Sequence, residues 1–230
     1  MNDNLASLGY RMPAEWEKQS STWLAWPHNK NDWPDKFENI PSTFAKITSA
    51  LSKVQNVDIL IQSKIVKKNI KKILIKEQTN LNRVNFHIIK TNRVWTRDTG
   101  PIFLVNDLLK KKIMTNFHFN AWAKYKDYNF DNAIKPQIAK IKNIELIDVK
   151  AKIKNKIKDV ILEGGAIDVN GKGTLIATKE CLLSKVQERN PGLSREKLEI
   201  ILSESLNIRS EEHTSELQSH SDLVCRLLLE

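Results

Sequence analysis

Short strand-type hydrophobic runs alternate with stretches of helical spacing along most of the chain. The strand-type runs lie at Ser21–Trp26, Val57–Ile61, Val84–Ile89 and Ile144–Val149. Between and after them, apolar residues recur at helical spacing in Pro41–Val54, Lys64–Lys76, Ala133–Ile141 and Arg195–Ser205. Apolar residues three to four positions apart indicate amphipathic helices. The alternation predicts an α/β fold with mixed strand directions.

The spacing also predicts which helix faces are buried. In the first helix Phe44, Ile47 and Leu51 share one face, and Pro41 and Ser42 begin it. The apolar positions of the second helix are Ile65, Ile70, Ile73 and Leu74. We expect these residues to pack against the sheet and the lysines to face solvent. Ser194 is the expected N-cap of the last helix.

Two pairs of runs have the spacing of hairpins. Ile102–Val105 and Lys112–Phe119 form one pair. Ala166–Val169 and Thr174–Thr178 form the other, around a turn that contains Gly171 and Gly173. Between them, Ala151–Lys158 is predicted to be a polar connector or an edge strand protected by lysines.

Composition limits the protein class. With 230 residues and 40% hydrophobic content, the chain can bury a core in one large or two small domains. Polar residues at Met1–Leu8 argue against a signal peptide, and no apolar run has the length of a membrane span. Two cysteines do not make a disulfide framework. We therefore expect a cytoplasmic protein with no membrane partner.

The formal net charge of +10 comes mostly from lysine. The densest basic run is Lys64–Lys76, which raises the alternative of a basic, non-catalytic binding protein that uses this face. Arginine is scarce and no aromatic residue interleaves with these lysines. Both facts argue against nucleic acid as the partner and favour an ordinary lysine-rich surface.

Two motifs place an acid beside glycines at the end of an apolar run. Val94–Pro101 reads VWTRDTGP and contains Asp98, and Ile161–Asp168 reads ILEGGAID and contains Glu163. A rigid turn that presents a carboxylate is a common way to aim charge into a pocket. The alternative for the first motif alone is a surface turn with a local Arg97–Asp98 pair.

Histidine and cysteine do not suggest a metal site. No pair of these residues has the spacing of metal ligands. His87 and His118 fall in expected strands, where a histidine is more often structural than a ligand.

The character of the chain changes at Arg209. Arg209–Glu230 contains no lysine and is rich in Ser, Leu and Glu. Its first part, RSEEHTSELQSH, resembles the in-frame translation of a sequencing-library adapter. We expect residues 1–208 to be the native part and residues 209–230 to be a non-native tail, which we leave out of the site analysis together with Cys225.

The motifs together carry a family resemblance. The chain contains LGYRMPAEWEKQSSTWLAWP, VWTRDTGP, FNAW, ILEGGAIDVNGKGTL and RNPGLSREKL in this order. This series resembles the agmatine deiminase family, which includes the bacterial-type peptidylarginine deiminases, from about Leu8 to Ile208. The resemblance implies a pentein fold, a propeller of ββαβ units around a central site. Here it would be the N-terminal part of one such catalytic domain, an incomplete propeller.

The chemistry that the resemblance implies is hydrolysis of a guanidinium to a ureido group, with release of ammonia. A guanidinium is a planar, charged fork of N–H donors, which two carboxylates can hold. The motifs assign that catalytic and substrate-binding role to Asp98 and Glu163, and a pocket-wall role to Trp95 and Trp122. Arg97 would orient a neighbouring acid. No metal or organic cofactor is implied.

The resemblance also implies a cysteine nucleophile and a histidine acid–base in two glycine-containing motifs. Neither motif occurs in the sequence, and Cys181 aligns with a non-nucleophilic position. We therefore expect an inactive fragment of a guanidine hydrolase. Agmatine is the expected substrate, and a peptidylarginine or another arginine derivative is the alternative. The sequence leaves open whether the full-length protein is a homo-oligomer.

Overall fold

The computed structural model describes residues 4–177 and 179–208. The expected non-native tail, 209–230, lies outside the described residues, as does Thr178 of the second predicted hairpin. Among the residues that are described, no helix is both long enough and apolar enough to cross a bilayer.

The first structural unit is a three-stranded parallel sheet with two covering helices. Along the chain it contains β1 (Ser21–Ala25), α1 (Ile40–Ser52), β2 (Asn56–Ile61), α2 (Lys64–Lys76) and β3 (Val84–Ile88). The strands lie in the order β1-β2-β3, with Leu24 opposite Ile59 and Ile59 opposite Phe86. The strand and helix predictions for this unit are confirmed to within two residues at each end.

The second unit has the order strand, strand, helix, strand. It contains β4 (Ile102–Asn106), β5 (Lys111–Asn116), α4 (Asn129–Asn132), α5 (Ile134–Lys142) and β6 (Leu146–Asp148). β4 pairs antiparallel with β5 in the predicted hairpin, and β5 pairs parallel with β6. α5 makes the crossover between the two parallel strands, so the unit is a ββαβ module.

The third part consists of two hairpins and two helices. β7 (Lys150–Ile153) pairs with β8 (Lys156–Asp159), and β9 (Ile167–Val169) pairs with β10 (Leu175–Ala177). The helices α6 (Lys179–Leu183) and α7 (Arg195–Leu206) follow, and Ser194 caps α7 as predicted.

The segment Ala151–Lys158, predicted as a polar connector or an edge strand, forms most of the β7–β8 hairpin, in which both strands are edges. Lys154 and Asn155, with φ of 48° and 63°, form its tight turn. Asparagine adopts positive φ more readily than most residues, which is the sequence signal for such a turn.

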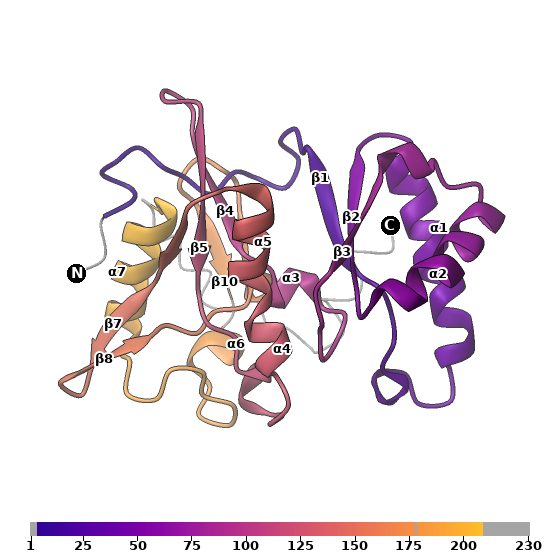
Figure 1. Ribbon diagram of the computed structural model, residues 1–230. Helices are drawn as coiled ribbons and strands as arrows, with labels where there is room; N and C mark the ends of the chain where they lie inside the picture. Colours follow the sequence, from indigo (N-terminus) through magenta and orange to yellow (C-terminus); the bar gives the residue numbers. More distant parts are fainter. Residues whose placement is uncertain (1–3, 178, 209–230) are drawn as a thin grey trace.

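Figure 1 shows the units as two lobes. The β1–β3 sheet with α1 and α2 forms one lobe, β4, β5, α5 and α7 belong to the other, and α3 (Thr96–Thr99) lies between them. The described strands form four separate sheets, each with two edges, so the arrangement is open.

Alternate faces of the first sheet pack on different partners. Val57, Ile59 and Ile61 of β2 pack with residues of α1 and α2 in one core cluster. Leu60, on the other face, packs in a second cluster with Ile138 of α5 and Met114 of β5. α5 therefore joins the first sheet to the second unit. The remaining cluster includes Leu104, Val160, Leu198 and Leu202, and buries α7.

Two of the predicted buried helix positions are exposed. Ile47 is 42% exposed and Ile65 is 88% exposed. In α1 the buried positions are Ala45, Thr48 and Ser52, so the packed face is rotated toward small residues. Phe44 and Leu51 of the predicted face do pack against the cluster that contains Val57, Ile59 and Ile61.

Candidate functional site

The motif that contains Asp98 is a single helical turn, α3, and not the simple turn at a strand end that the sequence predicts. The hydroxyl of Thr96 donates to the carbonyl of Trp23 at 2.9 Å, which ties α3 to the first sheet. The Nε of Arg97 donates to the carbonyl of Gly164 at 3.0 Å, which ties α3 to the second motif. Arg97 also pairs with Glu15. The guanidinium of Arg97 thus holds the two motifs together.

The two glycines after Glu163 permit this contact. A Cβ on Gly164 would overlap the carbonyl oxygen of Arg97, and a Cβ on Gly165 would overlap the carboxylate of Asp98. The amide of Gly165 instead donates to Oδ1 of Asp98 at 3.1 Å. The glycine pair therefore brings the two acidic motifs side by side, although they are 65 positions apart.

Asp98 is partly buried, and its environment favours the protonated form more than water does. Burial, together with the charge of Glu163, raises the pKa of Asp98 to about 6. The Gly165 amide, the Trp122 indole N–H and the charge of Arg97 oppose this shift. An incoming cation would favour the ionised carboxylate for the same electrostatic reason.

Glu163 lies deeper, at 2% exposure, and has a partner that the sequence analysis missed. The Nε of Arg189 donates to Oε1 of Glu163 at 3.0 Å, and Arg189 is itself buried. Oε2 of Glu163 is buried without a hydrogen-bond partner among the described residues. Arg189 belongs to the RNPGLSREKL motif, but no local pattern indicates that it reaches Glu163. One carboxylate oxygen is thus neutralised and the other is left to receive a donor.

The two tryptophans predicted as walls adjoin this pair. Trp95 immediately precedes α3, is 45% exposed and lies 6.1 Å from Trp33 between ring centroids. Trp122 packs edge-on against Phe119 at 5.1 Å and donates its indole N–H to Asp98. Both side chains are therefore available to line a pocket at Asp98.

Trp122 is held in an uncommon backbone conformation. Ala121, Trp122 and Ala123 have φ of 52°, 59° and 53°, three consecutive non-glycine residues in the left-handed region. Each such residue costs on the order of 1 kcal/mol or more. The strained turn orients the indole toward Asp98, which is a site-specific reason for its presence.

A second residue that the sequence analysis missed is Lys135 of α5. Its side chain is 1% exposed, and its Nζ has no hydrogen-bond partner among the described residues. Burial lowers the pKa of Lys135 to about 8, against the charges of Glu163, Asp131 and Asp98, which raise it. A lysine on a helix face of mixed polarity gives no sequence signal that it is buried.

The histidines of the described residues lie elsewhere. His28 contacts Gln62, His87 contacts Asp58, and the Nε2 of His118 lies 3.5 Å from a carboxylate oxygen of Asp159. His118 falls in a loop with one isolated bridge to Ile161, not in the predicted strand. Cys181 lies on α6 and is partly buried. No group of three or more potential metal ligands occurs among the described residues.

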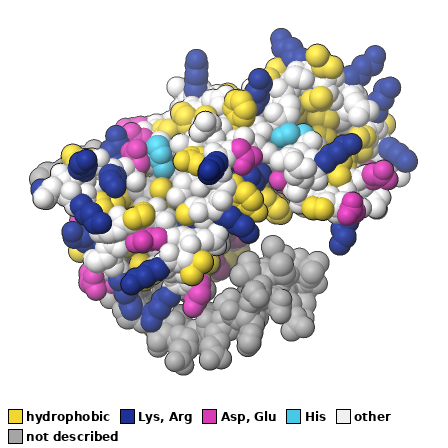
Figure 2. Space-filling view, turned by 90° about the horizontal axis from the view of Figure 1, so that it is seen from below, with side chains coloured by type: hydrophobic (Ala, Val, Ile, Leu, Met, Phe, Trp, Pro, Cys, Tyr) yellow, Lys and Arg dark blue, Asp and Glu magenta, His cyan; other side chains and the backbone are white. Residues whose placement is uncertain are grey.

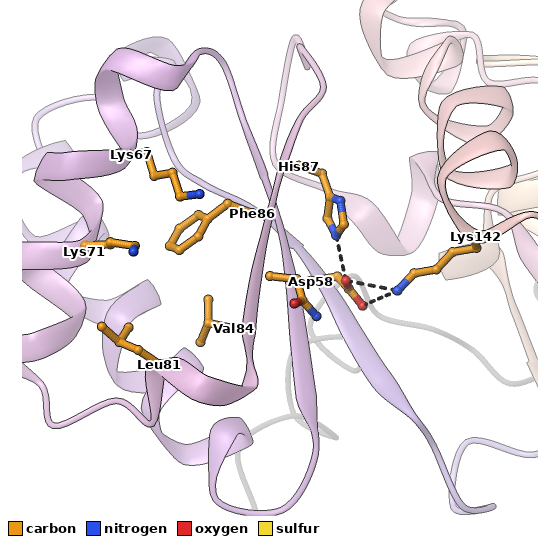
Figure 3. Close-up of a pocket in the computed structure, with 9 residues that line it drawn as sticks. Asp58, Lys67, Lys71, Leu81, Val84, Phe86, His87 and Lys142 are labelled. Carbon is orange, nitrogen blue, oxygen red and sulfur yellow. Dashed lines mark hydrogen bonds and ion pairs between the residues drawn. The ribbon is translucent and has the colours of Figure 1, made fainter.

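A separate pocket of about 540 Å³ lies along β3, the edge strand of the first sheet. Figure 3 shows Lys67 and Lys71 of α2 near Phe86 on one side of the strand. On its other side, the carboxylate of Asp58 accepts hydrogen bonds from His87 at 2.7 Å and Lys142 at 3.0 Å. Burial raises the pKa of Asp58, but the hydrogen bonds from His87, Ser21 and Lys142 outweigh it and hold it at about 2. This network links β2 to α5 and is internally satisfied.

Comparisons with known proteins identify the family of this chain. The profile of the Porphyromonas-type peptidyl-arginine deiminase family matches residues 11–214. The agmatine deiminase of Ectopseudomonas mendocina is 32% identical over 206 residues, which are 87% of this chain and 51% of that protein. The agmatine deiminase of Pseudomonas syringae pv. tomato is 28% identical over 90% of this chain and 53% of its own length. The chain thus spans about half the length of the curated relatives it matches.

Solved structures show the same fold. Agmatine deiminase of Enterococcus faecalis superposes with a TM-score of 0.74 at 28% identity, over 89% of this chain and 52% of that one. A substrate-bound agmatine deiminase of C. jejuni gives 0.71 at 27% identity, over 87% and 54%. The predicted pentein-type α/β fold is confirmed, and its open sheets fit an incomplete propeller. The chain belongs to the Porphyromonas-type peptidyl-arginine deiminase family.

Proposed function

We propose that this chain supplies the guanidinium-binding half of a deiminase site, with agmatine as the substrate. The observation that carries the proposal is the convergence of Asp98 and Glu163, each with acceptor capacity, next to exposed Trp95. A guanidinium presents two edges of N–H donors in one plane, and two carboxylates match two edges. Trp95 would contact the face of the cation or its aliphatic stem.

The reaction we assign to the complete protein replaces one guanidinium nitrogen with an oxygen from water. Agmatine and water give N-carbamoylputrescine and ammonia. Asp98 and Glu163 would fix the guanidinium carbon for attack and stabilise its positive charge. A cysteine thiolate and a histidine would carry the covalent and proton-transfer steps. The sequence contains neither the histidine motif nor the cysteine motif that the resemblance implies, so we expect the 230-residue chain to bind agmatine without turning it over.

The substrate within the guanidine class is part of the proposal. Several similar proteins carry the name agmatine deiminase, whereas the matching family is named for peptidyl-arginine. Agmatine ends in an amine, whereas peptidyl-arginine continues into a peptide backbone. A site that takes peptidyl-arginine therefore needs room for that backbone. We also propose that the protein is cytoplasmic. Whether the full-length protein is a homo-oligomer is left open.

Calorimetric titration tests the binding function. We expect agmatine to bind the wild-type chain and 1,4-diaminobutane, which has no guanidinium, not to bind. Asp98→Asn should weaken agmatine binding at least tenfold because it removes a charge-assisted acceptor. Glu38→Gln, a matched change at an exposed carboxylate, should leave binding unchanged. Equal affinity for both ligands, or no effect of Asp98→Asn, would refute the proposal.

The pocket beside β3 supports a second candidate function, the binding of a small organic anion. Lys67 and Lys71 supply positive charge, and Leu81, Val84 and Phe86 supply an apolar wall. Figure 2 shows other basic side chains dispersed over the visible face and not gathered into one tract, which does not favour nucleic acid.

Titration with phenyl phosphate tests this second function. Its phosphate suits the two lysines, and its ring suits Phe86. The double variant Lys67→Ala, Lys71→Ala should abolish binding, whereas Lys68→Ala, Lys72→Ala on the same helix should not. Equal effects of the two double variants would indicate unspecific attraction to a basic helix.

A further inference from the structure

Lys135 is a buried cation that the proposed chemistry does not use. It lies on α5, in the ββαβ unit, and its ammonium makes no hydrogen bond with a described residue. A buried charge without a partner is strongly unfavourable unless nearby charges compensate it. The compensation comes from carboxylates of three different segments.

Those carboxylates belong to Glu163, Asp131 on α4 and Asp98 on α3, in decreasing order of their effect on Lys135. Oε2 of Glu163 and Oδ2 of Asp131 are also buried without hydrogen-bond partners. Lys135 and these two carboxylates thus each have a buried polar atom that makes no hydrogen bond with a described residue, although Nη1 of Arg93 lies 4.0 Å from Oδ2 of Asp131. Of the three carboxylates, Glu163 raises the pKa of Lys135 most, and it is also a proposed ligand of the substrate.

The arginines near these carboxylates are held differently. Arg189 donates to Glu163, Arg97 donates to Gly164, and Arg93 donates to Asp127 and lies 4.0 Å from Asp131. All three are hydrogen-bonded and, as arginines, cannot lose their proton in a protein. Lys135, as a lysine, can lose its proton.

A guanidinium that enters this site adds a permanent positive charge. It would share Glu163 and Asp98 with Lys135, in surroundings where like charges repel more strongly than in water. The repulsion disappears if the lysine becomes neutral. The site then keeps the same total charge before and after binding.

We propose that Lys135 is the resident counter-ion of the carboxylate site and that it releases its proton to solvent when a guanidinium binds. The inference rests on the proposed function and deepens it, because it makes binding an exchange of one cation for another. Lys135 acts through Glu163 and Asp98 and is a positioning residue, not a catalytic one.

The pKa of Lys135 supports the exchange. At a pKa of about 8, roughly 90% of the lysine is protonated at pH 7. A guanidinium neutralises the carboxylates that raise this pKa and excludes water, so the pKa falls further and the proton leaves. Asp98, with a pKa of about 6, is only about 10% protonated at pH 7 and releases little.

Calorimetry in two buffers of different ionisation enthalpy counts the protons released. We expect the wild-type chain to release close to one proton per agmatine at pH 7, and Lys135→Met to release about 0.1. Lys140→Met, at an exposed lysine of the same helix, should release as much as the wild type.

Lys135→Arg separates this role from a structural one. Arginine keeps the buried charge and cannot release it, so agmatine binding should weaken at least tenfold. Lys135→Met should bind agmatine within a few-fold of the wild type. A purely structural lysine would give the opposite order, with arginine the better replacement.

A second measurement uses the wild-type chain and does not depend on agmatine binding by a variant. In a chain labelled with 13C at lysine Cε, the Lys135 resonance should titrate near pH 8 in the free chain and at a lower pH with agmatine present. If agmatine binds but no proton is released, or Lys135→Met releases as many as the wild type, the exchange is refuted while the proposed function stands. If agmatine does not bind the wild-type chain, both fail.

Discussion

At the scale of single residues, the candidate site contains two carboxylates in different surroundings, Glu163 and Asp98. Glu163 is paired with Arg189, so its charge is fixed from one side. Asp98 has weaker donors, the Gly165 amide and the Trp122 indole, and its pKa is raised to about 6 by burial and by Glu163. We infer that Asp98 is the acid whose ionisation controls ligand binding at low pH.

This inference predicts a pH dependence of affinity. In Lys135→Met, where only Asp98 titrates near neutrality, the association constant for agmatine should be flat above pH 7 and fall about tenfold per unit below pH 6. The wild type should show a further rise up to about pH 8 from Lys135. A flat profile between pH 5 and 7 in the variant would contradict the role of Asp98.

The raised pKa of Asp98 also makes the stability of the folded chain depend on pH. The folded-state pKa of Asp98 lies above its unfolded value, so the folded chain binds more protons between about pH 4 and 6. Asp98 therefore costs stability as pH rises through this window. Asp98→Asn should be more stable than the wild type at pH 7 by about 1–2 kcal/mol, and near equal at pH 4, in urea unfolding. A larger gain at pH 4 than at pH 7 would be inconsistent with a buried, raised carboxyl group.

At the scale of elements, glycines and a strained turn assemble the site. Gly164 and Gly165 let the loop before β9 approach α3, and the left-handed turn at Ala121–Ala123 brings Trp122 to Asp98. Such strain persists only where the surroundings compensate for it. We interpret the turn as a device that places one hydrogen-bond donor.

Trp122→Phe tests that interpretation. Phenylalanine keeps the edge contact to Phe119 but has no N–H, so the pKa of Asp98 should rise further. Agmatine affinity should then fall several-fold at pH 6 and much less at pH 8. Equal losses at both pH values would indicate a packing defect, and Trp16→Phe, at an exposed tryptophan, serves as the control.

The elements themselves follow from sequence patterns to a large extent. The parallel strands of the first sheet, the β4–β5 and β9–β10 hairpins and the four longer helices match their hydrophobic spacing. Motifs that resemble a family indicate Asp98 and Glu163 as candidate site residues. What the sequence could not reveal is the long-range pairing of Arg189 with Glu163 and the burial of Lys135, because neither leaves a local signal. The exposure of Ile47 on α1 and of Ile65 on α2 differs from the prediction, because helical spacing alone does not fix the exact face that packs on the sheet.

At the scale of the whole molecule, the two lobes are joined by α5 and by an ion network around the buried carboxylate of Asp58. Leu60 and Ile138 supply the apolar contact, and Asp58, His87 and Lys142 supply the polar one. Because α5 also carries Lys135, a change in how the lobes meet would move the site.

Asp58→Asn tests the network. The folded-state pKa of Asp58, about 2, lies below its unfolded value, so its contribution is present above about pH 4 and is lost as pH falls toward 2. At pH 7 the variant should lose about 2–3 kcal/mol in urea unfolding, and the difference should shrink below pH 3. Glu38→Gln, at an exposed carboxylate, should lose nothing. A difference that does not depend on pH would rule out the electrostatic explanation.

The proposed function requires that a guanidinium bind between Asp98 and Glu163. The most direct test is a crystal structure of this chain grown with agmatine. We expect guanidinium nitrogens within about 2.7–3.1 Å of a carboxylate oxygen of each residue, with the aliphatic stem against Trp95. Agmatine bound elsewhere, or bound through its amine at these carboxylates with the guanidinium in solvent, would contradict it.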